Sequence, residues 1–333
     1  MEPLSAINDR LAADPGTPPV LAEALKVARE FVPGLYFDMD TREYFADPCP
    51  APSLTQSIAK ILLDHSPAHA RLAHPRLNPD YEATDPKKYD IGNIAHALLL
   101  GRGKSIEVID GDDWVADRKA KSEAREAAAA AGKLAVLSRD FDIGHAMAAA
   151  ARRQLEERGF GGAWEDAIGD AEVVIAWSEG PIWFRSMIDW LQSDRKIPWD
   201  YKTTGASAAP HVLAKKVADD GWDIQAAMHE RGLNALFPQD AGRRQHLFVC
   251  QENFPPYALT VVRLPEAALT MGRKKLAVAT SLWARSLIDD DWPAYPAETL
   301  VPEYPDYAER RWLDREVGEF SGATRMISSL MGG

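Results

Sequence analysis

Apolar residues recur three and four positions apart through much of the first half of the chain, which is the period of an amphipathic helix. Ser53 and Gln56 have the spacing of a capping box, so we expect a helix that begins there and ends at Ser66-Pro67. The sequence IGNIAHALLLG follows the same period until Gly101 stops it. Further helices are expected over residues 20–31, 117–131 and 138–157.

The period changes after Gly162. The sequences AEVVIAWS, PIWFRSMIDWL and KIPWDYKTT are short, rich in Val, Ile and Trp, and separated by turn residues, which predicts a three-stranded meander. Helical patterns over 208–217 and 222–236 follow, and then a second strand pair, RQHLFVCQE and YALTVVRL, and a long helix from 265 to 287. We therefore expect one α/β domain with a helical N-terminal region.

Composition narrows the class of protein. The chain has 333 residues, of which 46% are hydrophobic and 26% charged, as in globular proteins with a sizeable core. We find no signal-peptide pattern at the start and no run of about 20 apolar residues, so we expect a cytoplasmic protein with no membrane partner. Cys49 and Cys250 are too few and too far apart to form a zinc ribbon or a four-cysteine cluster within this chain.

Candidate chemistry lies in the stretch KIPWDYKTTG, residues 196–205. Alternate residues of a strand share a face, so Asp200 and Lys202 point the same way, with the Tyr201 carbonyl near them. Asp189 falls near the end of the preceding strand, and two carboxylates held together require a cation, for which Mg²⁺ or Mn²⁺ is suited. A salt bridge between Asp189 and Lys202, with Asp200 capping a turn, is the open alternative.

Two helices carry further polar candidates. Gly92 and His96 lie one turn apart, where a glycine lets the backbone approach another element and the imidazole can serve as a ligand. A lone histidine on an apolar helix is more often a core residue than a ligand. The presence of Asp189 and Asp200 in the same chain favours the ligand. Gln225 falls in the first turn of the helix after the strands, near enough in sequence to fold over their ends.

The order of these residues matches a known family. Gly92-x-x-x-His96, Asp189, Asp200-x-Lys202 and Gln225-x-x-x-His229 together resemble the RecB-like branch of the PD-(D/E)XK nucleases. The flanking sequences are similar to the RecE-type exonuclease (exonuclease VIII) domain of phages and prophages: SIAKILLDHSPAH, IGNIAHALLLG, FRSMIDWL, WDYKTT, DIQAAMHERGL and WPAYP. The resemblance runs from about Ser53 to Pro302. We therefore expect an N-terminal extension over 1–50 and a nuclease domain over 51–333.

Two positions depart from the family pattern. Ile188 stands where the motif name has proline, at a position that takes no part in the chemistry. His229 stands where the RecB-like pattern usually has tyrosine, which leaves the role of this ring open.

The resemblance implies a restriction-endonuclease-like core, a central mixed sheet flanked by helices, that hydrolyses DNA phosphodiesters. It implies Mg²⁺, for which Mn²⁺ can substitute, held by His96, Asp189, Asp200 and the Tyr201 carbonyl. Lys202 is implied to orient or deprotonate the attacking water and Gln225 to hold the water or a phosphate oxygen. Glu172, at the start of the first strand of the meander, is an additional candidate ligand or supporting acid, although an acid at a strand edge is more often solvated.

The resemblance also implies 5′ to 3′ digestion of linear duplex DNA, a homo-oligomer and a single-strand annealing partner. A structure- or sequence-selective endonuclease and a nonenzymatic DNA- or partner-binding member are the alternatives, and the intact Asp, Asp-x-Lys set disfavours the second. The net charge of −12 requires a locally basic path for DNA. Our candidates for its lining are Arg71, Arg76, Lys87, Lys88, Lys215 and Lys216.

Overall fold

The computed structural model describes residues 31–82, 91–102, 105–131, 133–165 and 167–331. By its internal contacts the chain divides into two compact units, Met1–Ala294 and Tyr295–Gly333, and we describe each by itself. The first unit contains the sheet, nearly all of the helices and every candidate site residue.

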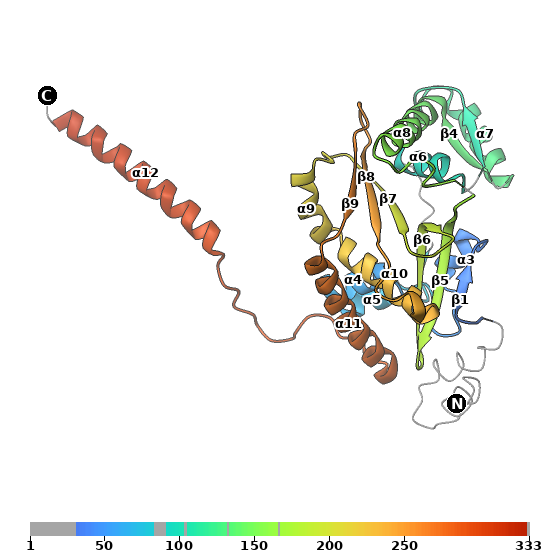
Figure 1. The fold of residues 1–333 in the computed structure, drawn as a ribbon. Coiled ribbons are helices and arrows are strands. Elements are labelled where there is room, and N and C mark those ends of the chain that lie inside the picture. The colour runs from blue at the N-terminus through green and yellow to red at the C-terminus, as the bar shows by residue number, and fades with distance from the viewer. Residues whose placement is uncertain (1–30, 83–90, 103–104, 132, 166, 332–333) are drawn as a thin grey trace. The chain divides into compact units, whose positions relative to one another are not determined.

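A seven-stranded mixed sheet forms the centre of the first unit, with strand order β1-β5-β6-β7-β8-β9 and β2 beside β6 (Figure 1). The pairs β7–β8 and β2–β6 are parallel and the others antiparallel, so the expected mixed sheet is confirmed. Its strands are β1 (Gly34–Tyr36), β2 (Ser53–Leu54), β5 (Gly169–Glu179), β6 (Ile182–Gln192), β7 (Pro198–Thr204), β8 (Leu247–Glu252) and β9 (Leu259–Arg263).

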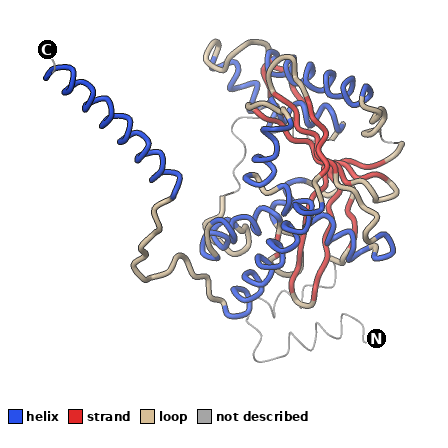
Figure 2. Tube along the Cα trace, turned by 60° about the vertical axis from the view of Figure 1, so that its left-hand side comes forward, coloured by secondary structure: helices blue, strands red, loops and turns tan. Residues whose placement is uncertain are grey.

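Helices flank this twisted sheet (Figure 2). Their apolar side chains and those of the sheet bury one another in three clusters. One cluster joins β5 and β6 to α4 (Gln56–Asp64), α5 (Pro67–Ala73), α10 (Trp222–Leu236) and α11 (Glu266–Asp289). A second joins β7 and β8 to α6 (Ile91–Leu100) and α8 (Ser138–Glu157). A third packs α9 (Pro210–Asp219) and the start of α10 on β8. The remaining short elements are α3 (Thr41–Ala46), α7 (Arg118–Ala130) and a 3₁₀ turn (Pro238–Asp240).

Most of the expected elements are confirmed, and several differ; among them, β1, α3 and α5 were not expected. Thr55, not Ser53, caps α4, because its side chain accepts a hydrogen bond from the Ile58 amide at 3.2 Å while Ser53 lies in β2. A parallel two-stranded sheet, β3 (Ile106–Ile109) and β4 (Leu134–Leu137), was not expected. Nor was α12 (Asp306–Met331). The helix predicted over 20–31 lies outside the described residues except for Phe31.

The described part of the expected N-terminal extension belongs to the first unit. β1 pairs antiparallel with β5, and Tyr44 of α3 and Cys49 are buried. Residues 34–50 are therefore continuous with the sheet and its core, and the division by contacts falls after Ala294.

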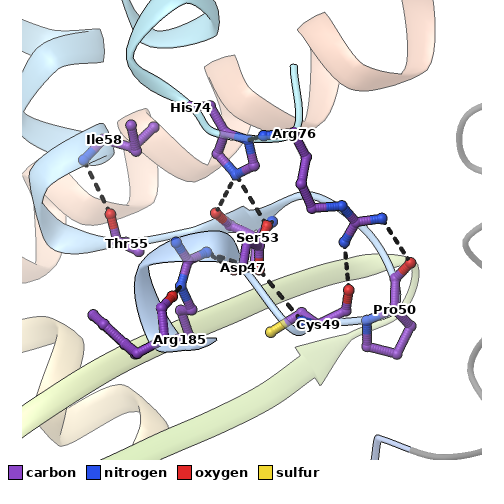
Figure 3. A network of polar contacts seen from close by, with 10 residues as sticks. Asp47, Cys49, Pro50, Ser53, Thr55, Ile58, His74, Arg76 and Arg185 are labelled. Atoms are coloured by element: carbon purple, nitrogen blue, oxygen red, sulfur yellow. Dashed lines mark hydrogen bonds and ion pairs between the residues drawn. The ribbon is translucent and has the colours of Figure 1, made fainter. Parts of the chain in front are cut away.

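A buried polar cluster ties this N-terminal segment to the sheet (Figure 3). The Asp47 carboxylate accepts from the Ser53 amide at 2.9 Å and hydroxyl at 2.8 Å, and it lies 2.8 Å from Arg185 Nη1 and 3.1 Å from His74 Nε2. Burial raises the pKa of Asp47, but its hydrogen bonds and the charges of His74 and Arg185 outweigh that effect and lower it. We call Asp47, Ser53, His74 and Arg185 the Asp47 cluster.

The second unit contains α12, whose side chains Trp312, Val317 and Phe320 are exposed. In the described part of the chain, no helix combines the length and the apolar character needed to cross a membrane.

Candidate active site

The site forms where β6 and β7 separate. These two strands pair only at Trp190–Trp199 and Leu191–Pro198. One further step in the same register places Asp189 opposite Asp200, so the two predicted carboxylates meet at the point where the ladder ends. There Asp189 Oδ2 accepts a hydrogen bond from the Tyr201 amide at 2.7 Å. The approach of Asp189 to Asp200, which the sequence left open as one of two alternatives, is therefore present.

Asp200 is buried without a full set of partners. Its side chain is 1% exposed, Gln225 Nε2 donates to its Oδ2, and Lys202 Nζ lies 2.5 Å from its Oδ1. That ion pair lacks hydrogen-bond geometry, so among the described residues Oδ1 has no hydrogen-bond partner. Burial and the neighbouring Asp189 charge raise the pKa of Asp200 to about 6, although Lys202 acts in the opposite direction. The carboxylate pair is thus short of positive charge even beside the lysine.

His96 reaches the pair from α6. Its Nε2 lies 3.4 Å from Asp189 Oδ2. Burial lowers the pKa of His96, but Asp189, with Glu172 and Asp200, raises it by more. Burial raises the pKa of Asp189, but His96, with Lys202 and the Tyr201 amide, lowers it by more. Close approach of α6 to β7 depends on Gly92, because a Cβ built there would lie 2.2 Å from Thr203 Oγ1. The expectation that this glycine permits a close approach is confirmed.

Lys202 and Glu172 complete the charges of the site. Burial lowers the pKa of Lys202, but Asp200 and Asp189 raise it by more, so the side chain is an ammonium at neutral pH. Glu172 lies in β5 between the pairs Ala171–Trp190 and Val173–Ile188, where the unbroken register places it opposite Asp189, and it has a left-handed φ of 52°. Burial raises its pKa, and the neighbouring Asp189 raises it further while His96 lowers it.

One neighbour of the site, His246, escaped sequence analysis. His229, one turn after Gln225, is fully buried with its Nδ1 2.8 Å from Nε2 of His246, the residue before β8. No spacing rule links residues 229 and 246, because their contact depends on α10 packing over the sheet. Gln251 is a second omission: its side chain accepts from the Tyr201 hydroxyl at 2.5 Å and donates to the Met147 carbonyl at 3.0 Å.

The chemistry of the donors fits a divalent cation. Two carboxylates and an imidazole are hard or borderline ligands, and burial and the Asp189 charge raise the pKa of Asp200 even though Lys202 Nζ lies 2.5 Å from its Oδ1. Among the described residues, no three His, Cys, Asp or Glu side chains converge at metal-ligand spacing. In these rotamers Asp189 faces His96 and the Tyr201 amide, while Asp200 faces Lys202 and Gln225.

The predicted basic lining is largely engaged in other contacts. Arg76 donates to the Cys49 and Pro50 carbonyls, and Arg71 lies over the Trp292 ring at 5.9 Å. Lys215 and Lys216 are paired with acids on their own helix, at 2.6 and 2.7 Å. Lys87 and Lys88 lie outside the described residues.

Comparison with known proteins identifies the fold. No family model and no curated protein sequence matches the chain. The structure is similar to the crystal structure of a protein from Eubacterium rectale that is provisionally named an exonuclease, with a TM-score of 0.50 and 8% sequence identity. The match covers 81% of this chain and 96% of that one. At this identity the likeness shows a shared fold, a mixed sheet flanked by helices.

Proposed function

We propose that this chain is a metal-dependent deoxyribonuclease of the PD-(D/E)XK superfamily. The observation that carries the proposal is the meeting of Asp189 and Asp200 where β6 and β7 separate, with Lys202 two residues further along β7. The sequence resemblance and the likeness of fold to a protein provisionally named an exonuclease support it.

In this proposal Asp189, Asp200, the Tyr201 carbonyl and His96 hold Mg²⁺, and Mn²⁺ can substitute. A bound ion lowers the pKa of water and stabilises charge on a phosphate undergoing hydrolysis. Lys202 offsets negative charge and orients the water, a role that its raised pKa supports better than that of a base. Gln225, bonded to Asp200, orients that carboxylate and offers its amide to the water or a phosphate oxygen. Glu172 is a supporting acid beside His96.

The finer proposal is a RecE-type exonuclease that degrades linear duplex DNA from 5′ to 3′ in phage or prophage recombination. It includes a homo-oligomer and a single-strand annealing partner. The support for these features is the sequence resemblance, which spans about Ser53 to Pro302.

The decisive experiment uses two linear duplexes, one labelled at the 5′ ends and one at the 3′ ends, and a covalently closed circle of the same sequence. We expect Mg²⁺-dependent release of label from the linear substrates, earliest from the 5′ ends, an intact circle, and no reaction with excess chelator. Asp200→Asn is the matched control, because it removes one charge at constant shape. Cleavage of the circle would indicate an endonuclease, and DNA binding without cleavage in Mg²⁺ or Mn²⁺ would indicate a nonenzymatic protein.

A further inference from the structure

Two stacked histidines lie beside the site without a part in the proposed chemistry. His229 Nδ1 and His246 Nε2 are 2.8 Å apart, and the two rings are stacked with centroids 5.0 Å apart. Burial lowers the pKa of His229 to about 4, and burial together with His229 lowers that of His246. The pair is therefore neutral at neutral pH. Gln225, one turn before His229 on α10, donates to Asp200, which places the pair beside the carboxylates.

The surroundings indicate which ring donates. A neutral imidazole carries one N–H, so only one of the two rings can donate across the 2.8 Å contact. The Met187 carbonyl of β6 acts on His229 as an acceptor, although within the described residues His229 Nε2 has no partner of standard geometry. A proton on that Nε2 leaves Nδ1 to accept, so we assign the donor as His246 Nε2–H.

The pair lies beside the place where the pairing of β6 with β7 ends. Met187 lies two residues before Asp189 on β6. His246 precedes Leu247, which pairs with Trp199, the neighbour of Asp200 on β7. Pairing between β6 and β7 stops at Trp190–Trp199, and beyond it the Asp189 carboxylate accepts a hydrogen bond from the Tyr201 amide at 2.7 Å. α10, which carries His229, packs on β6, and the contact of His229 with His246 links α10 to the start of β8.

We propose that His229 and His246 are positioning residues that hold β6 against the β7–β8 pair and so keep Asp189 and Asp200 at the separation a divalent cation requires. This inference rests on the proposed function. Because Gln225 lies one turn before His229 on α10, the same pair also holds the amide that contacts Asp200. Groups that orient metal ligands without touching the metal typically change metal affinity by about 10–100-fold when they are removed.

The test is a calorimetric titration of Mn²⁺ into the full chain without DNA, comparing His246→Gln with His246→Asn. The amide of Gln reaches the position of Nε2 and can donate to His229, whereas the shorter Asn amide cannot, and both substitutions are polar and of similar size. We expect the Mn²⁺ Kd of His246→Gln to stay within about 3-fold of wild type and that of His246→Asn to rise about 10-fold or more. The Mg²⁺ concentration for half-maximal DNA cleavage should rise in parallel.

Three further variants separate the effect on metal binding from a general effect of the substitutions. His211→Phe, on the exposed start of α9, is a matched histidine control that should bind Mn²⁺ as wild type does. The double variant His229→Phe, His246→Phe should bind no more weakly than His246→Phe alone, because the pair acts as a unit. Equal Mn²⁺ affinity in His246→Asn and wild type, or equal weakening in the Asn and Gln variants, would overturn the inference. A wild-type chain that neither binds Mn²⁺ nor cleaves DNA would instead overturn the proposed function.

Discussion

Two polar clusters lie along β6, one at Arg185 and the other at Asp189. Each contains a buried carboxylate, and the pKa of that carboxylate is lowered in the first and raised in the second. In the Asp47 cluster, Arg185 of β6 faces a carboxylate that also accepts from Ser53 and lies beside His74, and the pKa of Asp47 is lowered. At the site, Asp189 of β6 faces a second carboxylate, and the pKa of Asp200 is raised to about 6. Asp47 and Asp200 are both buried, so burial alone does not explain the difference.

The difference lies in how fully each carboxylate is satisfied. Ser53, His74 and Arg185 each offer Asp47 a donor or a cation, so the negative charge of Asp47 stabilises the fold. Asp200 has one amide donor, one lysine and a second acid, so its charge costs stability. β6 therefore contributes to one cluster whose carboxylate is fully paired and to another whose carboxylate is not, and the hydrogen-bond partners distinguish them.

The largest expected effect is the loss of DNA hydrolysis when residues of the Asp200 site are replaced. Asp200→Ala and Lys202→Ala should each lower the DNA hydrolysis rate at least about 10³-fold, because both groups act on charge that develops during the reaction. The measurement is the initial rate on labelled linear duplex at saturating Mg²⁺, with circular dichroism as the check on folding. A folded variant that retains more than about a tenth of the wild-type rate would remove that residue from the site.

The next effect separates the two clusters by stability. Asp47→Ala leaves Arg185 buried without its carboxylate, so we expect it to lower the free energy of unfolding by about 3–5 kcal/mol. Asp200→Asn should leave the free energy of unfolding unchanged or raise it, because it removes an unsatisfied buried charge. Urea unfolding of the two variants in chelator measures both. Equal destabilisation by the two substitutions would contradict the distinction we draw.

The two carboxylates should also respond to pH with opposite signs. The folded pKa of Asp200, about 6, lies above its unfolded value near 3.9, so its ionisation destabilises the fold as pH rises from about 4 to 6. The difference is on the order of 3 kcal/mol. Asp47 has a lowered folded pKa, so its contribution is complete above about pH 4 and is lost as pH falls through that folded pKa.

Urea unfolding of the wild type and of Asp200→Asn, both in chelator and across this pH range, measures how much the ionisation of Asp200 changes the free energy of unfolding. We expect the wild type to lose stability relative to the variant between about pH 4 and 6. Parallel curves for the two proteins would show that Asp200 ionises normally.

The smallest expected effect concerns the approach of α6. Gly92→Ala places a methyl against Thr203 and should move His96 away from Asp189, which we expect to raise the Mn²⁺ Kd about 10-fold. Thr203→Ala in the same chain should restore part of the affinity, and Asn93→Ala, exposed on the same helix, is the control. If Gly92→Ala binds Mn²⁺ as tightly as wild type, His96 is not held by this contact.

The sequence by itself determined the elements that carry the site. Alternation in KIPWDYKTTG predicts that Asp200 and Lys202 share a face, and they form an ion pair. Helical spacing places Gly92 and His96 on one face of α6, and both contact the β6–β7 end of the sheet. These relations hold within a few residues, where backbone geometry fixes which side chains are neighbours.

Only the tertiary structure decided which polar residues became partners across the fold. Ser53 reads as a helix cap in sequence, yet it hydrogen-bonds with Asp47 and Arg185 because β2 adds to the sheet beside β6. His246 has no sequence signal at all and meets His229 only because α10 packs over the sheet near the start of β8. Such contacts depend on the packing of elements far apart in the chain, and a local pattern sets each element's faces without specifying what those faces will meet.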